Sequence, residues 1–223
     1  MIRVSGFSGY PALEAPLVAR LVECLPVFRR PSASAAPSVA AARALAYLLL
    51  RRELGFSPDF TYNSAGKPAV AGERAREVSF SISHSKTVVA VAVRRGGGAV
   101  GFDLEDRITS PRRERAAARI FSGGERRRMD RATKFWTLKE SQLKCAGCGF
   151  AGGASERAFD FSPWADSEIF TLGGMWFFSR DAGAFHFSVC AASPFSSLSV
   201  SWLDDARPLL APPETATLLG NAD

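Results

Sequence analysis

The stretch VGFDLED, residues 100–106, places three carboxylates at the end of an apolar run, in a chain that has 22 acidic and 28 basic residues. If this stretch is a β-strand, successive side chains point to opposite faces. One face then carries Val100, Phe102 and Leu104, and the other carries Gly101, Asp103 and Glu105. Two carboxylates on one face, roughly 6.6 Å apart, can bind a single hard cation such as Mg²⁺. Alternatively, the acids cap the turn or helix that follows the strand.

A second charged stretch, FWTLKESQLKCAG at residues 135–147, follows a helical pattern. Trp136, Glu140 and Lys144 recur every four residues and therefore share one helical face. A Glu that precedes a Lys by four residues is also typical of a solvent-exposed ion pair. The large ring of Trp136 on the same face favours partial burial, so this face is a candidate wall of a site.

Helical patterns occur in three further segments. Apolar residues at helical spacing predict a helix at 39–54. A serine before a proline predicts another helix at 110–120. The sequence SGGE at 122–125 has the spacing of a capping box and predicts the start of a third helix. The residues expected to begin or end helices are Ser38, Ser110, Ser122 with Glu125, and Gly147.

Strand patterns occur on both sides of these helices. They are found at 79–85, 88–93, 100–105, 168–172, 175–181, 184–192 and 198–203. A helix followed by strands therefore occurs twice, which predicts one α+β chain of two halves, at residues 1–105 and 106–203. The tail, 204–223, is expected to be weakly structured.

Composition limits the class of protein. The chain has 223 residues, 47% hydrophobic and 22% charged, as is usual for a globular protein. Its apolar runs are too short for a membrane span, and glycines and Pro11 interrupt its N-terminal stretch, so neither an anchor nor a secretory signal is expected. With four scattered cysteines, this predicts a cytoplasmic protein. The net charge of +6 predicts a negatively charged partner.

Five short stretches together resemble one family. In chain order they are GKP at 66–68, FSISHS at 80–85, VGFDLE at 100–105, RIFSGGE at 119–125 and FWTLKESQLKCAG at 135–147. The chain is similar to the 4'-phosphopantetheinyl transferases, in particular the single-chain, surfactin-synthetase-activating type. The resemblance covers roughly residues 29–192.

The resemblance implies both a fold and a reaction. The fold would have two like halves related by a pseudo-twofold, each with a long helix packed on a small, mainly antiparallel sheet. The reaction would be the Mg²⁺-dependent transfer of the phosphopantetheine arm of coenzyme A to a serine of an apo carrier protein, releasing 3',5'-ADP. The partners would be coenzyme A and an acidic carrier protein, with no nucleic acid and no membrane, and the enzyme would act as a monomer.

By matching positions, the resemblance assigns the metal to Asp103, Glu105 and Glu140. Glu140 alternatively, or additionally, takes the proton of the incoming serine. Lys144 would stabilise the developing phosphate charge. Lys139 would support the helix or contact phosphate.

The remaining matched positions would contact coenzyme A. They are Lys67, Ser83, His84, Arg29, Arg30 and Arg43. Arg43 is offset by one residue, since the family's arginine aligns with Ala42. A family lysine is replaced by Cys148, which removes a positive charge near the nucleotide and creates Cys145-x-x-Cys148. A zinc site would need two further ligands, and a redox motif would begin a helix rather than end one.

Two other functions would use the same residues differently. A Mg²⁺-dependent nuclease of the restriction type needs Glu-x-Lys on one strand, whereas Glu140 and Lys144 are four residues apart in a helical pattern. A nucleic-acid-binding module could use the basic segment at 107–144. That alternative leaves the strand carboxylates without a role, because they would repel phosphate in the absence of a metal.

Overall fold

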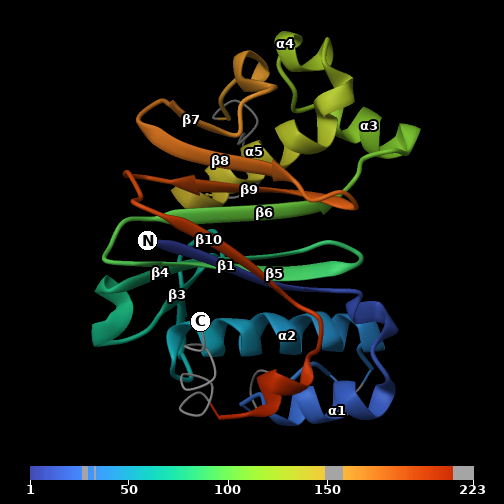
Figure 1. Ribbon diagram of the computed structural model, residues 1–223, viewed down its shortest axis with the longest axis vertical. Coiled ribbons are helices and arrows are strands. Elements are labelled where there is room, and N and C mark those ends of the chain that lie inside the picture. Colours follow the sequence, from blue (N-terminus) through green and yellow to red (C-terminus); the bar gives the residue numbers. More distant parts are fainter. Residues whose placement is uncertain (27–29, 33, 149–157, 213–223) are drawn as a thin grey trace.

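The computed structural model describes residues 1–26, 30–32, 34–148 and 158–212 as two stacked four-stranded sheets with helices on their outer faces (Figure 1). The sheets have the strand orders β10-β1-β5-β4 and β6-β9-β8-β7. Helix α2 covers the outer face of the first sheet, α1 packs on the far side of α2, and α5 covers the outer face of the second sheet. A mixed α+β fold is therefore confirmed, while a pseudo-twofold relation between two halves stays a prediction.

Most of the predicted strands and helices are present in the structure. The strands are β1 (Ile2–Ser8), β2 (Phe60–Tyr62), β3 (Pro68–Val70), β4 (Val78–His84), β5 (Val88–Arg95), β6 (Val100–Asp106), β7 (Ile169–Leu172), β8 (Met175–Asp181), β9 (Phe185–Ala191) and β10 (Leu198–Leu203). The helices are α1 (Ala15–Glu23), α2 (Pro37–Leu54), α3 (Pro111–Ala118), α4 (Gly123–Arg126) and α5 (Ala132–Ala146).

The two faces of β6 differ as its alternation predicts. Val100, Phe102 and Leu104 are fully buried between the two sheets, where they pack against residues of β1, β5, β8 and β9. The opposite face lies under α5. A Cβ at Gly101 would collide with the backbone of Ser141 and Cys145, so the glycine allows α5 to approach β6 closely.

The predicted boundaries at residues 105 and 203 do not separate the two sheets. β6 belongs to the first predicted half, yet it pairs antiparallel with β9 of the second. β10 belongs to the second predicted half, yet it pairs parallel with β1 of the first. Each sheet therefore contains one strand from the other half of the sequence. Alternation within a strand specifies which face is buried and does not specify the neighbouring strand.

Helix ends agree with the sequence at three of the four expected positions. The Ser110 side chain accepts a hydrogen bond from Arg113 N, and Ser122 and Glu125 form a reciprocal capping box. Gly147 ends α5 in the left-handed conformation with φ 76°. The prediction for Ser38 is wrong, because α2 begins one residue earlier at Pro37, whose fixed φ suits the first helical position.

Both ends of the chain contain structure that the sequence pattern did not predict. Neither β1 nor α1 was expected, and the described part of the tail contains a short 3-10 helix at Arg207–Leu210. Leu209 is buried against α1 and α2, and the guanidinium of Arg51 donates to the carbonyls of Leu209 and Ala211 at 2.8 Å. The expectation of a weakly structured tail is therefore wrong for residues 204–212.

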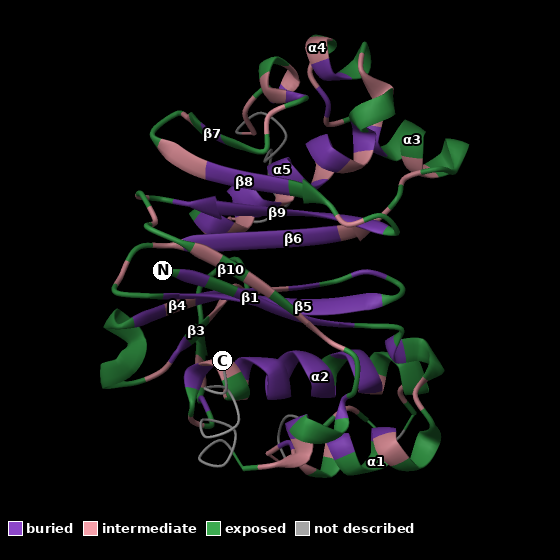
Figure 2. Cartoon of the chain, viewed as in Figure 1, coloured by how far each residue is buried: buried purple, intermediate pink, exposed green. Residues whose placement is uncertain are grey.

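Burial follows the layers (Figure 2). The facing sides of the sheets and most of α2 are buried, whereas α3 is largely exposed. Within the described ranges, no helix combines the length and apolar character needed to cross a membrane.

Candidate active site

Asp103 lies where β4, β6 and α5 meet. Its Oδ1 accepts hydrogen bonds at 2.7 Å from the hydroxyl of Ser83 on β4 and from the ammonium of Lys144 on α5. Lys144 Nζ also donates to Ser83 Oγ at 3.0 Å, which closes a triangle. Asp103 is only 3% exposed, and its Oδ2 is buried with no hydrogen-bond partner among the residues described. A buried carboxylate oxygen without a partner is energetically costly and favours a cation beside it.

Glu105 follows on the same face of β6 and is paired with Arg113 of α3. Arg113 Nη2 lies 2.6 Å from Glu105 Oε2, and Arg113 Nη1 donates to the Asp106 carbonyl at 3.4 Å. Burial raises the pKa of Glu105, as does the nearby charge of Asp103, while Arg113 opposes the increase. Glu105 is thus held by an arginine that the sequence analysis did not select.

Asp106, the third acid of the opening stretch, has a structural role. Its carboxylate accepts hydrogen bonds from Ser85 Oγ, Lys86 N and Thr87 Oγ1 at 2.7 to 3.0 Å. These contacts tie the turn between β4 and β5 to the end of β6. Asp106 thus binds a turn that precedes β6 in the chain, and not the turn or helix that follows the strand.

Glu140 brings the third predicted metal ligand to the same place from α5. Burial raises its pKa to about 7, with further increases from the charges of Asp103 and Glu105, and Lys144 lowers it. Burial also raises the pKa of Asp103 despite the hydrogen bonds from Lys144 and Ser83. Asp103, Glu105 and Glu140 therefore lie close enough to disfavour one another's ionisation, as like charges in a partly buried site do.

The chemistry of this cluster suits a hard divalent cation, because carboxylate oxygens are the ligands that Mg²⁺ prefers. The side chains are not arranged as a ready-made metal site, however. Within the described part of the chain, no three His, Cys, Asp or Glu side chains have the geometry to hold a metal ion. Lys144 and Arg113 instead neutralise two of the three carboxylates.

Two cavities meet at His84, which is exposed at the end of β4. One, of about 570 Å³, is also lined by Glu105 and Arg113. The other, of about 400 Å³, is also lined by Arg43 and by aromatic residues of the first half. The predicted contacts at 43 and 84 therefore border open space next to the carboxylates.

Lys67 lies on the other side of the cluster. It lines a cavity of about 210 Å³ together with Lys144 and Gly147. Its ammonium donates to the Val100 carbonyl at 3.0 Å, and burial lowers its pKa. An ammonium in this state gains from an anion placed next to it.

Of the three remaining predicted contacts, Arg30 and Lys139 have partners within the protein, and one is outside the described residues. Arg30 donates to the carbonyls of Glu23 and Leu25 at the end of α1. Lys139 is 1% exposed; its Nζ lies 3.0 Å from Glu125 Oε2 and donates to the Phe159 carbonyl at 2.7 Å. Lys139 thus supports α5 from within the second layer. Arg29 falls in the range 27–29, which the structure does not describe.

The paired cysteines of the sequence carry no metal or redox site in the structure. Among the described residues all four cysteines are free thiols. Cys145 is buried, and Cys148 Sγ donates to the Leu143 carbonyl at 3.7 Å.

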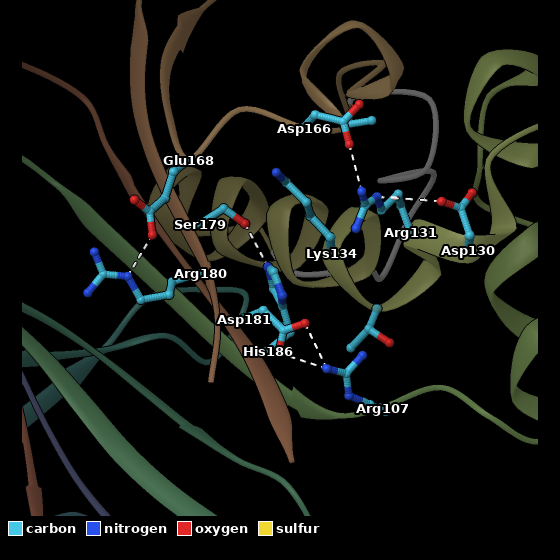
Figure 3. A pocket seen from close by; sticks show the side chains of 12 residues that line it. Arg107, Asp130, Arg131, Lys134, Asp166, Glu168, Ser179, Arg180, Asp181 and His186 are labelled. Atoms are coloured by element: carbon cyan, nitrogen blue, oxygen red, sulfur yellow. Dashed lines mark hydrogen bonds and ion pairs between the residues drawn. The ribbon is translucent and has the colours of Figure 1, made fainter. Parts of the chain in front are cut away.

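A second polar region, which sequence reasoning missed, lies on the same sheet face (Figure 3). This cavity, of about 440 Å³, is lined by Arg107, Lys134, Ser179, His186 and other charged residues. His186 Nε2 lies 2.8 Å from Ser179 Oγ. Burial lowers the pKa of His186 to about 4, and the charge of Lys134 lowers it further. The available signal was the polar residues in two otherwise apolar strands, SRD at 179–181 and HFS at 186–188.

The comparisons with known proteins agree with the class that these residues suggest. Residues 99–208, about half of the chain, match the family model of the 4'-phosphopantetheinyl transferase superfamily. This segment contains Asp103, Glu105, Glu140 and Lys144. Both this match and the relative described next support a transferase.

The relative is a protein of Synechocystis sp. whose name is "Putative 4'-phosphopantetheinyl transferase". The two sequences are 30% identical over 121 residues, which is 49% of each chain. The chain thus spans about half the length of this relative.

Proposed function

We propose that the protein transfers the 4'-phosphopantetheine arm of coenzyme A to a serine hydroxyl of an apo acyl or peptidyl carrier protein and releases 3',5'-ADP. The observation that carries this proposal is the convergence of Asp103, Glu105 and Glu140 beside Lys144, where α5 crosses β6. The match of residues 99–208 to the transferase superfamily supports the same reaction.

We propose that Asp103, Glu105 and Glu140 hold a Mg²⁺ ion. The charges of Asp103 and Glu105 raise the pKa of Glu140, so the three carboxylates carry excess negative charge, and the buried Oδ2 of Asp103 has no hydrogen-bond partner among the described residues. When bound, the ion would neutralise charge on the pyrophosphate of coenzyme A as the bond to the leaving phosphate breaks.

Glu140 and Lys144 have further proposed roles in the transfer itself. A carboxylate with a pKa of about 7 can accept a proton near neutral pH, so Glu140 is suited to take the proton of the attacking serine hydroxyl. The serine oxygen then forms a bond to the β-phosphorus of coenzyme A, and the bond to the α-phosphate oxygen breaks. The Lys144 side chain is 27% exposed, so its Nζ is suited to donate a hydrogen bond to the phosphate oxygens.

The cavities around the cluster suggest where coenzyme A binds. Arg43, His84 and Ser83 lie on one side of the carboxylates and Lys67 on the other. Each can donate to phosphate, so we propose that they bind the nucleotide and pyrophosphate. We also propose Arg30 as a contact of the nucleotide, and for Lys139 we propose the alternative role of supporting α5.

An acidic carrier protein would suit the basic segment that precedes the cluster. Residues 107–144 contain twelve Lys or Arg and four Asp or Glu. Much of α3 is exposed, so these charges can increase the rate of association with an acidic partner. We further propose the surfactin-synthetase-activating type, a monomer with a pseudo-twofold, and a cytoplasmic location, in line with the free cysteines.

The test is a mass measurement on the carrier protein. Incubation of the protein with coenzyme A, Mg²⁺ and an apo carrier should add one phosphopantetheine group to the carrier, and excess chelator should abolish the gain. A carrier whose acceptor serine is changed to alanine is the control. The absence of a gain with fatty acid, polyketide and peptide carriers would contradict the proposal, and a panel of these carriers would identify the pathway.

A further inference from the structure

Arg113 is the cation closest to Glu105, and it comes from α3 rather than from β4, β6 or α5. Its Nη2 lies 2.6 Å from Glu105 Oε2. The two side chains are 34% and 23% exposed, so the pair is partly shielded from water. A charge-assisted hydrogen bond of this length is strong.

This contact competes with a metal ion for Glu105. The guanidinium takes one acceptor site of Oε2, and the carboxylate keeps its other acceptor sites, on which Mg²⁺ would bind at about 2.0 to 2.1 Å. The two cations would then lie side by side and repel each other. Arg113 therefore weakens the attraction of Glu105 for a divalent ion.

Arg113 has room to leave. It lines the cavity of about 570 Å³ that also borders His84 and Lys86. Its second hydrogen bond, from Nη1 to the Asp106 carbonyl, is long at 3.4 Å. The backbone of α3 is held independently, because Arg113 N donates to the Ser110 side chain at 3.3 Å. The side chain can therefore turn into the cavity while the helix stays in place.

We propose that Arg113 is a positioning residue that competes with the metal for Glu105 and moves to an anionic phosphate of the substrate when the metal binds. This inference rests on the proposed function. It makes the binding of metal and coenzyme A mutually dependent, because the phosphate offers the displaced guanidinium a new partner. Metal alone binds weakly, and coenzyme A strengthens its binding.

The experiment measures Mn²⁺, a paramagnetic substitute for Mg²⁺, by electron paramagnetic resonance of the free ion. Without coenzyme A, Arg113→Gln should bind Mn²⁺ about fivefold more tightly than the wild type, the factor that corresponds to about 1 kcal/mol. Arg113→Lys should restore the weak binding because the positive charge is retained. With coenzyme A present, the advantage of Arg113→Gln should disappear.

The matched control is Arg112→Gln, which removes the same charge from an exposed position on the same helix. Binding by Arg113→Gln equal to that of Arg112→Gln, or weaker than that of the wild type, would overturn the inference and leave the proposed function intact. A wild type that binds no Mn²⁺, with or without coenzyme A, would overturn both.

Discussion

Two charged regions share the face of the second sheet that α5 covers, and they differ in how their charges are balanced. Asp103 and Glu105 of β6 pair in register with Ser188 and His186 of β9, so the regions lie one strand apart. Around His186 each carboxylate of the cavity lining has an arginine partner. Three pairs are within 3 Å, Arg107–Asp181, Arg131–Asp166 and Arg180–Glu168, and Asp130 lies 3.5 Å from Arg128 and Arg131. In the cluster, three carboxylates meet two cations, and no ion pair of the described residues includes Glu140.

The shifts of the pKa values show the same difference in charge balance between the two regions. Arginines lower the pKa values of Asp166 and Glu168. Burial raises those of Asp103, Glu105 and Glu140, and neighbouring acids raise those of Glu105 and Glu140 further. A region whose charges are already paired gains little from a ligand, while one with excess negative charge gains from a cation. A polar cavity alone is thus a poor guide to the active site, and charge imbalance is a better one.

The largest expected effect comes from substitutions in the Asp103, Glu105 and Glu140 cluster, which leave the region around His186 unchanged. Asp103→Asn and Glu140→Gln should each lower the rate of carrier modification on the order of 10³-fold, because each removes a charge that stabilises the metal and the transferred phosphate. The rate is followed by the mass of the carrier, and circular dichroism checks the fold.

The matched controls are Asp166→Asn and Glu168→Gln, which remove carboxylates of the His186 region. Their rates should stay within about twofold of the wild type, since exposed ion pairs contribute little. A large loss of rate in these controls, or full activity in Asp103→Asn, would contradict the assignment of the site.

A second prediction separates Lys139 from Lys144, two of the three lysines of α5. Glu125→Ala should destabilise the fold by about 3 to 5 kcal/mol, because it leaves the buried ammonium of Lys139 without its counter-ion. Chemical denaturation measures the change. The KM for coenzyme A should not change, since Lys139 faces the interior. An increased KM with unchanged stability would return Lys139 to the nucleotide site.

The sequence predicted those features that depend on local rules. The alternation of β6 places Asp103 and Glu105 on one face whatever the neighbouring strand. Helical spacing likewise places Glu140 and Lys144 on one face of α5, and caps fix where helices begin. The convergence of the two elements was expected only because their motifs resemble a known family.

Other features depend on contacts between distant residues. The parallel pairing of β10 with β1 joins segments nearly 200 residues apart, and no local pattern encodes it. Arg113 lies in an ordinary basic helix, and only the direction in which α3 leaves β6 brings it to Glu105. The polar contacts of His186 likewise require β8 and β9 to be in register.

The hydrogen bonds near His186 determine that its Nε2 atom carries a proton. Thr137 donates to the Lys134 carbonyl at 3.0 Å, so its oxygen must accept from Ser188 Oγ at 2.8 Å. Ser188 has then used its proton and accepts from Ser179 at 3.0 Å. Ser179 in turn accepts from His186 Nε2 at 2.8 Å. His186 Nε2 therefore carries a proton, and the pKa of about 4 makes the ring neutral at pH 7.

This neutral histidine predicts acid-sensitive stability. Its pKa is about 4 in the folded protein and 6.5 in the unfolded chain, so the unfolded state binds the proton first as pH falls. The contribution of His186 is complete above about pH 7, and about 3 kcal/mol of it should be lost by pH 4. Denaturation of the wild type and of His186→Gln at several pH values isolates the contribution of His186 to the free energy of unfolding. If this free energy depends on pH equally in the two proteins, the prediction is contradicted.

The smallest expected effect comes from a substitution that adds a cation beside the cluster. Cys148 follows Gly147, which lines the same cavity as Lys67 and Lys144. Cys148→Lys supplies the positive charge that the resembling family has at this position, and it should lower the KM for coenzyme A about twofold to threefold, because a partly exposed charge pair contributes about 0.5 kcal/mol. Cys148→Ser is the control for loss of the thiol. If both variants lower the KM equally, charge at this position has no part in nucleotide binding.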